Sequence, residues 1–376
     1  MAFKPMKTAV IGCGMISDIY LKNLKETYKI TELVGCSDII PERSAKQAEK
    51  YGIRQMTNEE IFADPEIEMV VNITYPTAHF EVSRRALEAG KHVYCEKMTT
   101  LTVEESTALL ELAQSKGLFV GGAADTFLCG ATQTARMIID SGMVGTPVMA
   151  NALLARSYHH ERFNTAPYKR FAFCPGGGII FDMGSYYLSE LVFLLGPIKR
   201  VAGFSQIRNP HRTFVNPDSP LYGQPMEVES YNNTTGVLEF ESGALGNITM
   251  TSESAKGTDT FQIFCTDGTI DLGDPNTYRT SIKIIDKVGK VSEIVTNFGY
   301  KGDNFRGLGV ADAVYAIRNN RSARCSGELN RHVLEAALGI CQSSEDGKYY
   351  EMTTRCERPE PFKPGYTERQ EMQLEI

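Results

Sequence analysis

Short apolar runs alternate with segments of helical periodicity through the first third of the chain. Runs rich in Val, Ile and Leu between turn residues are typical of buried strands, and the intervening segments repeat their apolar residues at helical spacing. The pattern predicts strands at 8–11, 32–37, 69–73, 92–95 and 118–121, and helices at 41–51, 58–63, 77–89 and from Thr102 to near Gly117. Repeated strand–helix units joined by short turns are typical of a doubly wound parallel sheet, which binds ligands beyond the carboxyl ends of its strands.

A different pattern begins after residue 126. It predicts helices at 131–141, after Gly178, at 304–318 and at 329–343, and a strand at 148–157. From Val228 onward, alternating β-branched and polar runs are separated by turns at 241–243, 267–268 and 288–289, which indicates hairpins of a mostly antiparallel sheet. We therefore predict an α/β protein of two domains. Residues 1–126 form the parallel sheet, and residues 127–376 form a domain with a large open, mostly antiparallel sheet and an extended C-terminal tail.

Length and composition narrow the class of protein. The 376 residues are enough for two domains with sizeable cores, and 42% hydrophobic with 23% charged residues is ordinary for a globular protein. A formal charge of -7 argues against a nucleic-acid-binding surface, and no apolar run approaches the roughly 20 residues of a membrane helix. The N-terminus has no separate apolar leader, so we expect a cytoplasmic protein with neither nucleic-acid nor membrane partners.

The cysteine and histidine patterns give no indication of a metal. None of the nine cysteines has CxxC spacing, so neither a disulfide framework nor a zinc site is indicated. His159 and His160 are adjacent, and side chains of adjacent residues on a strand face opposite ways. We expect no metal.

A glycine turn after the first strand predicts a nucleotide site. Gly12 and Gly14 stand between the strand and a helical segment, where glycines let the backbone approach a pyrophosphate at a helix N-terminus. Ser17 stands at the third glycine position of the usual motif. Asp38 ends the second strand, 24 residues after Gly14, and an acidic residue there binds the ribose hydroxyls and repels a 2′-phosphate. NAD is therefore preferred to NADP; the alternatives are an ordinary turn at Gly12–Gly14 and a helix cap at Asp38.

Other candidate residues also follow predicted strands. Thr74–Pro76 and Glu96–Lys97 come directly after strands, and the carboxyl ends of parallel strands meet at one edge of a sheet. An exposed lysine at a strand end is the alternative for Lys97. The candidate cofactor-binding residues are Gly12, Gly14, Met15, Ile16, Asp38, Thr74, Tyr75, Pro76, His79, Glu96 and Lys97.

Four motifs resemble those of the glucose-fructose oxidoreductase / inositol dehydrogenase family, often called Gfo/Idh/MocA. They are GCGMIS at 12–17, NITYPTAH at 72–79, CEKM at 95–98 and GGGIIFDMG at 176–184, and the similarity extends through 237–248 and 304–317. The resemblance implies a Rossmann domain that binds a nicotinamide dinucleotide, and a C-terminal α/β domain whose sheet commonly forms oligomer contacts. It also implies reversible oxidation of a sugar or cyclitol hydroxyl.

The resemblance suggests roles for three side chains. Lys97 matches the lysine of the family's Glu-Lys-Pro motif, which lies near the nicotinamide and the reacting hydroxyl; Met98 replaces the proline. Asp182 matches the aspartate of an Asp-x-Gly-x-His motif, and Tyr186 stands at the histidine position. Tyrosine there resembles the branch of glucose-fructose oxidoreductase, dihydrodiol dehydrogenase and some xylose dehydrogenases. Lys97 and Tyr186 are thus the expected acid/base pair, and Asp182 the group that orients the substrate hydroxyl.

Substrate-binding residues are expected around these three. Asp182 and Tyr186 are four residues apart, which puts them on one side of a single helix; the alternative is a buried tyrosine bonded to a core aspartate. A loop rich in polar residues follows the strand at 148–157, and a solvated surface loop is the alternative there. The candidate substrate-binding residues are Lys97, Asp125, Arg156, Tyr158, His159, Asp182 and Tyr186.

The expected function is NAD-dependent interconversion of a hydroxyl and a carbonyl on a sugar, glycoside or cyclitol. We also expect a homo-oligomer formed through the C-terminal sheet. Two alternatives stay open. One is a lyase or glycoside-cleaving enzyme that uses transient oxidation by bound NAD. The other is a sugar or nucleotide sensor without catalysis.

Overall fold

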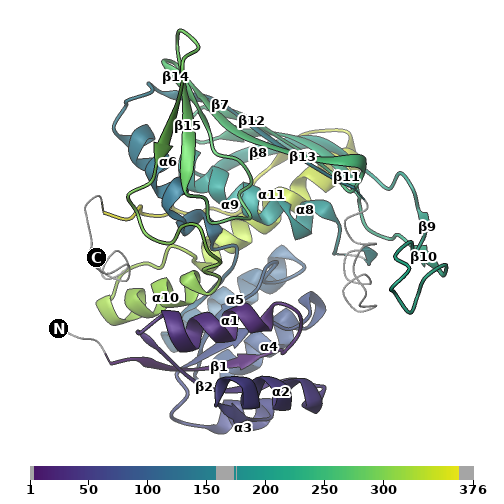
Figure 1. Ribbon diagram of the computed structural model, residues 1–376, viewed down its shortest axis with the longest axis vertical. Helices are drawn as coiled ribbons and strands as arrows, with labels where there is room; N and C mark the ends of the chain where they lie inside the picture. Colours follow the sequence, from purple (N-terminus) through teal and green to yellow (C-terminus); the bar gives the residue numbers. More distant parts are fainter. Residues whose placement is uncertain (1–3, 158–172, 175, 364–376) are drawn as a thin grey trace. The chain divides into compact units, whose positions relative to one another are not determined.

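The computed structural model describes residues 4–157, 173–174 and 176–363 (Figure 1). The chain divides into two compact units. Unit 1 consists of Met1–Gln133, Asn297–Arg331 and Pro359–Ile376, and unit 2 of Thr134–Thr296 and His332–Arg358. The predicted boundary at 126 lies close to the first division. Residues 297–331, however, were expected in the second domain and belong to unit 1.

Unit 1 is built on a six-stranded parallel sheet in the order β3-β2-β1-β4-β5-β6. The order reverses at β1, which lies between β2 and β4, so this is the doubly wound sheet that the sequence predicted. The strands are β1 (Met6–Ile11), β2 (Thr31–Ser37), β3 (Arg54–Gln55), β4 (Met69–Asn72), β5 (His92–Cys95) and β6 (Val120–Gly122).

Local signals account for the helices of unit 1. Proline occupies the first turn of α2 and of α4, where its missing N–H has no partner to lose. Gly52 and Gly117 end α2 and α5 in left-handed conformations. The helices are α1 (Ser17–Lys22), the π-helical turn η1 (Asn23–Thr27), α2 (Pro41–Tyr51), α3 (Asn58–Ala63), α4 (Pro76–Glu88), α5 (Val103–Lys116), the 3-10 turn η2 (Thr126–Leu128) and α10 (Leu308–Asn319). The predicted bounds of α2 and α3 agree with the structure.

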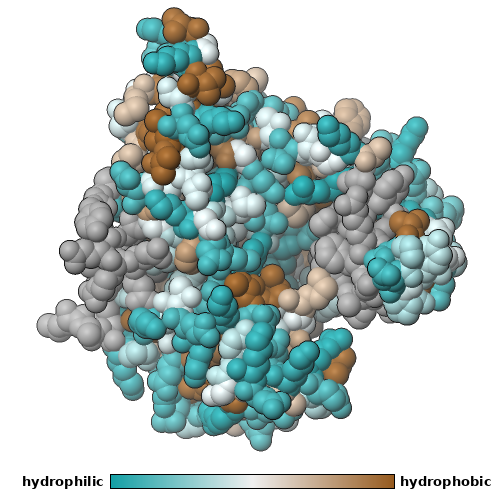
Figure 2. Space-filling model, viewed as in Figure 1, coloured by the Kyte–Doolittle hydropathy of each residue, from teal (hydrophilic) through white to brown (hydrophobic). Residues whose placement is uncertain are grey.

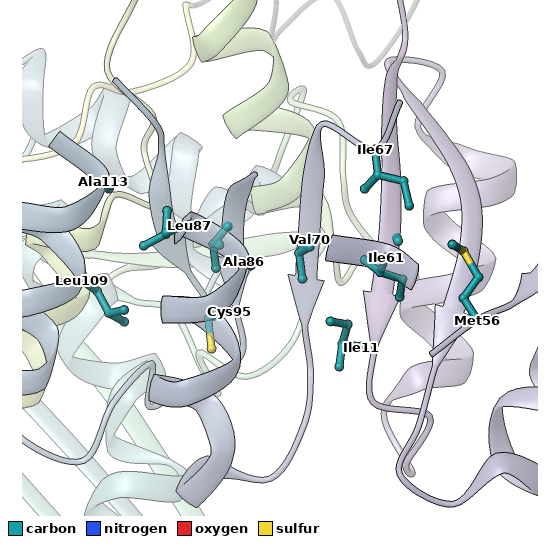
Figure 3. Packing of buried hydrophobic residues seen from close by; sticks show 12 residues of the cluster. Ile11, Met56, Ile61, Ile67, Val70, Ala86, Leu87, Cys95, Leu109 and Ala113 are labelled. Carbon is teal, nitrogen blue, oxygen red and sulfur yellow. The ribbon is translucent and has the colours of Figure 1, made fainter. Parts of the chain in front are cut away.

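The core of unit 1 forms where helices cover the parallel sheet. Figure 3 shows Ile11 and Val70 of the sheet, Ala86 and Leu87 of α4 and Leu109 of α5 in this cluster. All four residues of β4 are buried, as expected for a strand covered on both faces. The apolar interior fixes the strands, and thereby the positions of the residues that follow them.

Asp125 explains why residues 297–331 belong to unit 1. Its carboxylate accepts hydrogen bonds from the N–H groups of Gly307 (3.1 Å) and Gly309 (2.9 Å) at the start of α10. Gly309 also lies against Tyr94 of β5, where an added Cβ would be 2.4 Å from the tyrosine oxygen. Residues Leu308–Ala316 of α10 are buried, so this helix is part of the unit 1 interior.

Unit 2 contains a nine-stranded sheet in the order β16-β15-β14-β13-β7-β12-β11-β8-β17. The β7–β12 pair is parallel and the other pairs are antiparallel, which confirms a mostly antiparallel sheet. Its strands are β7 (Pro147–Ser157), β8 (Ile198–Gln206), β11 (Asn233–Phe240), β12 (Leu245–Thr251), β13 (Glu253–Cys265), β14 (Gly268–Asp271), β15 (Ser281–Asp286), β16 (Val291–Val295) and β17 (Tyr350–Glu351). A separate two-stranded sheet pairs β9 (His211–Thr213) with β10 (Pro225–Glu227).

Helices lie along one face of the large sheet (Figure 1). They are α6 (Gly130–Asp140), α8 (Ile179–Asp182), α9 (Gly184–Leu195) and α11 (Gly327–Asp346). Gly203 and Gly236 make room for Ile340 of α11, because a Cβ at either glycine would lie 2.8 Å from that side chain. Every residue of α9 is buried.

The single helix predicted after Gly178 is interrupted. Met183, with φ -105° and ψ -32°, separates α8 from α9, and the Tyr186 N–H donates to the Met183 carbonyl three residues back. The regular four-residue spacing assumed for Asp182 and Tyr186 is therefore broken between them.

Candidate functional site

Four candidate segments meet at the carboxyl edge of the unit 1 sheet. The glycine turn follows β1, Asp38 follows β2, Thr74–Pro76 follows β4, and Glu96–Lys97 follows β5. These strands are parallel and adjacent, so their carboxyl ends lie together.

The glycine turn has one closely packed and one open position. Gly12 has φ +106°, and a Cβ there would lie 2.6 Å from the Ile73 carbonyl oxygen, so only glycine fits between β1 and β4. A Cβ at Gly14 would meet nothing within 4 Å. The backbone at Gly14 is thus accessible just before α1, as the close approach of a pyrophosphate requires.

Asp38 is bonded to the glycine turn. Its Oδ2 accepts from the Cys13 N–H at 2.7 Å, and its Oδ1 accepts from the Ile40 N–H at 2.8 Å. The N-cap position of α2 is Ile40 and has no side-chain cap, so Asp38 is not the cap of that helix. A carboxylate oxygen accepts more than one hydrogen bond, and Asp38 keeps acceptor capacity for ribose hydroxyls.

A cavity of about 420 Å³ adjoins Asp38. It lies between the end of β2, the first turn of α2 and the start of α3. Its lining contains three carboxylates and no lysine or arginine: Ser37, Asp38, Ile39, Pro41, Ser44, Gln55, Met56, Thr57, Asn58, Glu59 and Glu60.

His79 connects two loops of the site. Its Nδ1 lies 2.7 Å from the Met98 carbonyl oxygen and its Nε2 lies 3.1 Å from the Thr74 carbonyl oxygen. Burial lowers the pKa of His79, so the ring is neutral at neutral pH and donates to one of these carbonyls. The sequence suggested that His79 contacts the cofactor; its buried ring instead positions the loops around the site.

Glu96 fixes the segment that carries Lys97. The buried Tyr20 hydroxyl donates to Glu96 Oε1 at 2.8 Å, and the Lys97 N–H donates to Glu96 Oε2 at 2.9 Å. Glu96 was expected to bind cofactor, and that stays a prediction; in the structure its buried carboxylate holds the Tyr20 hydroxyl and the Lys97 backbone. The Lys97–Met98 peptide is cis, and the Lys97 side chain is partly exposed.

Tyr20 was missed from the sequence. Its place on the apolar side of α1 indicates only that it is buried, and its partner lies 76 residues further along the chain.

The other cofactor candidates of unit 1 lie on its accessible surface. Met15 is 55% exposed and Tyr75 is 36% exposed. Ile16, Thr74 and Pro76 are partly exposed. The Thr74 hydroxyl donates to Asn72 Oδ1 at 2.7 Å, which orients the loop after β4.

The position of Asp125 does not support the role in substrate binding that the sequence suggested. It is 2% exposed, and its carboxylate binds the N–H groups at the start of α10. A carboxylate at a helix N-terminus is stabilised by those N–H groups, so its role is structural.

Unit 2 contributes three described candidates. Asp182 in α8 and Tyr186 in α9 are each 6% exposed, and Arg156 near the end of β7 forms an ion pair with Asp274 at 3.1 Å. Tyr158 and His159 lie outside the described residues. In the described part of the chain, no group of His, Cys, Asp and Glu residues has the arrangement of a metal site.

Within residues 4–157, 173–174 and 176–363, every helix is too short or too polar to cross a bilayer.

Two family models match the chain. One is described as an oxidoreductase family with an NAD-binding Rossmann fold and matches residues 6–122. The other is the GFO/IDH/MocA C-terminal domain and matches residues 132–271.

Curated relatives match at moderate identity. An uncharacterised oxidoreductase of Schizosaccharomyces pombe is 29% identical over 235 residues, and the scyllo-inositol 2-dehydrogenase (NAD(+)) of Bacillus subtilis is 26% identical over 321 residues. The first match covers 60% of this chain and 59% of that protein, and the second covers 84% and 87%. The chain thus spans less than two-thirds of the length of the Schizosaccharomyces pombe relative.

Solved structures share the fold. Levoglucosan dehydrogenase in complex with NADH superposes with a TM-score of 0.81 at 18% identity, covering 93% of this chain and 100% of that chain. An NAD-binding oxidoreductase of Klebsiella pneumoniae gives the same TM-score at 19% identity, covering 93% and 100%.

Proposed function

The chain belongs to the Gfo/Idh/MocA family of oxidoreductases, and we propose that it interconverts a hydroxyl and a carbonyl on a sugar, glycoside or cyclitol with NAD. The observation that carries the proposal is in unit 1. Lys97 is fixed through Glu96 and Tyr20 at the same sheet edge as the glycine turn and Asp38. The scyllo-inositol dehydrogenase relative supports a polyhydroxylated substrate.

The candidate residues of each unit have separate roles in this proposal. The backbone at Gly12–Gly14 contacts the pyrophosphate, and Asp38 binds the adenosine ribose. Bound NAD supplies the acceptor for the hydride that leaves the substrate carbon. Lys97 is proposed as an acid/base group, Tyr186 is proposed as an acid/base group, and Asp182 is proposed to orient a substrate hydroxyl.

The adenosine end of the site supports NAD as the cofactor in preference to NADP. A 2′-phosphate beside Asp38 would adjoin a cavity lined also by Glu59 and Glu60 and by no basic residue. Like charges in such a site repel, so a phosphorylated ribose is disfavoured.

We further propose that the uncovered face of the large sheet binds a second copy of this chain. On adjacent strands, it exposes Phe204 (80%), Val237 (55%), Leu245 (54%) and Met149 (45%). Directly paired residues, and residues two apart on one strand, point to the same face of a sheet. Val237 is two residues from Thr235, which pairs with Phe204, and two residues from Glu239, which pairs with Leu245; Leu245 also pairs with Met149.

Charge on this face favours self-association. Arg200 and Glu239 form an ion pair within it, so two copies of its central strands would meet without a large charge of one sign. Hydrophobic residues also gather over the β14–β15 region in Figure 2, and Val291 and Val295 of β16 are exposed. An exposed apolar face with a paired charge suits an interface between copies.

The proposed activity is tested by a substrate screen. Purified protein is mixed with NAD and a panel of polyols, free sugars and glycosides, and NADH absorbance and product are followed together. Stoichiometric NADH and oxidised product support the proposal. Product without NADH would instead indicate transient oxidation, and polyol binding without turnover would indicate a sensor.

A further inference from the structure

A polar cluster lies on the helix-covered face of the unit 2 sheet. Asp259 of β13 pairs with Leu154 of β7, so it shares a face with Phe261, two residues further along the strand. The ring of Tyr187 in α9 contacts Phe261 edge-on, with centroids 5.6 Å apart. Asp259 and Arg156 therefore point to the same face of the sheet, because Arg156 is two residues beyond Leu154 on β7. Tyr187 of α9 packs against this face.

A fourth member comes from the connection between β14 and β15. Asp274 Oδ2 lies 3.1 Å from Arg156 Nη2, and both side chains are partly exposed. The connection is fixed by Arg279, which donates to both oxygens of the buried Glu190 in α9 at 2.7 and 2.8 Å. Asn276 Nδ2 lies 3.9 Å from Met183 Sδ, which brings this connection beside the residue after Asp182.

Tyr187 has an unused hydroxyl on the helix-covered side of the sheet. It is fully buried, and its oxygen has no hydrogen-bond partner among the described residues. Burial raises the pKa of Tyr187, with Asp274 and Asp259 adding to the effect, so the hydroxyl remains a donor. Arg156 Nε is also buried without a partner in the described part of the chain. A buried donor without a partner calls for an explanation, and an acceptor on a ligand would supply one here.

The charges of the cluster select among ligands. Asp274 offsets the charge of Arg156, and Asp259 then leaves one excess negative charge. Asp259 is exposed on β13, and partial desolvation together with the charge of Asp274 raises its pKa. Hydroxyl groups can donate to these carboxylates and accept from Tyr187 and Arg156. A ligand carboxylate or phosphate would be repelled by Asp259.

We propose that Arg156, Tyr187, Asp259 and Asp274 form a subsite that binds neighbouring hydroxyl groups of an uncharged polyol and rejects sugar acids and sugar phosphates. The inference rests on the proposed function and names its substrate class. Tyr187, Asp259 and Asp274 are the specificity-determining residues that it adds.

Matched substrates and single variants test the subsite. Wild type, Tyr187→Phe, Asp259→Asn and Asp274→Asn are assayed with glucose, glucuronate and glucose 6-phosphate, and with each active polyol of the screen. Asp259→Asn and Asp274→Asn are each expected to raise KM for the neutral substrate about tenfold, because each weakens a hydrogen bond to a charged group. Tyr187→Phe is expected to raise KM about two- to tenfold, as for one hydrogen bond between uncharged groups, and all three variants should leave the Kd for NAD unchanged. Asp259→Asn is expected to raise the ratio of kcat/KM for glucuronate to kcat/KM for glucose by about tenfold. Glu293→Gln, on the edge strand β16, is the control and keeps wild-type kinetics.

The outcomes separate the subsite from the proposed function. If the wild type prefers glucuronate, or if the three variants behave like Glu293→Gln, the subsite is wrong although the enzyme turns over. If no sugar is oxidised, the proposed function fails. In that case, calorimetry of polyol binding to the wild type and to Asp259→Asn tests the subsite without turnover. Equal affinities of the two proteins for the polyol would contradict the subsite.

Discussion

Lys97 is held at the end of β5 through the carboxylate of the residue before it. Glu96 accepts from the Lys97 N–H and from the hydroxyl of Tyr20, so a side chain of α1 fixes the backbone beside the proposed acid/base group. This arrangement separates groups that react from groups that position them.

Replacing Lys97 by methionine is expected to lower kcat by roughly 10²–10⁴-fold, because a proton-transfer group is lost. NAD binding, measured by fluorescence titration, should stay nearly unchanged. Lys116→Met in α5 is the control, since that side chain is exposed. Turnover within about tenfold of wild type would show that Lys97 is not central.

Tyr186→Phe should also lower kcat by orders of magnitude if its hydroxyl exchanges the substrate proton. Its effect would differ from that of Tyr187→Phe, which is expected to raise KM. Steady-state kinetics on an active polyol distinguishes the two, and a near-normal kcat for Tyr186→Phe would remove it from the proposed mechanism.

Tyr20→Phe removes only the hydroxyl that holds Glu96. We expect kcat to fall about tenfold, as for one hydrogen bond to a charged group, while the Kd for NAD stays constant. Tyr28→Phe is a matched control, because Tyr28 is also buried in unit 1 and its hydroxyl donates to the Phe305 carbonyl. Equal effects of the two substitutions on kcat would indicate general destabilisation and not positioning.

At the scale of elements, the turn between β1 and α1 contains two glycines with different constraints. Gly12 is enclosed by the backbone of Ile73 and Thr74, whereas Gly14 faces open space. The packing of β1 against β4 requires the first glycine, and the approach of a ligand requires the second.

Alanine substitutions separate these requirements. Gly12→Ala forces a positive φ and a backbone contact, so we expect a loss of about 1–3 kcal/mol or more in the free energy of unfolding. Gly14→Ala should leave that free energy within about 0.5 kcal/mol and weaken NAD binding. Urea denaturation and NAD titration of both variants measure the two effects. Unchanged NAD affinity in Gly14→Ala would argue against a pyrophosphate at this turn.

At the scale of the whole molecule, the chain passes between its two units at 133/134, 296/297, 331/332 and 358/359. The uncovered face of the unit 2 sheet is the surface that we propose for association. Its exposed apolar side chains come from neighbouring strands, so one charged substitution at the centre should be effective.

Val237→Glu is expected to shift the protein from an oligomer toward the monomer, because two copies would bring like charges into an apolar contact. Light scattering coupled to size-exclusion chromatography measures the mass. Val215→Glu, at a 55%-exposed position between β9 and β10, is the comparison substitution and should leave the mass unchanged. A monomeric wild type would contradict the proposed interface.

Local pattern was sufficient for the elements that carry the cofactor site. Strand periodicity, proline at a first helical turn and glycine at a helix end act within a few residues, so α2, α3 and β5 were predicted with the bounds that the structure has. The strand ends then located Gly12, Gly14, Asp38 and Lys97 at one edge of the parallel sheet.

Tertiary structure decided which buried polar groups are already occupied. Asp125 binds N–H groups 182 and 184 residues away, and Glu96 binds a hydroxyl 76 residues earlier, so neither partner lies within a local pattern. The same reason applies to Arg156 and Asp274, which are 118 residues apart. The sequence determined the elements and the turn chemistry, because these depend on neighbours along the chain. Folding alone determined the partners of the carboxylates, because a buried charge bonds whichever groups the fold brings to it.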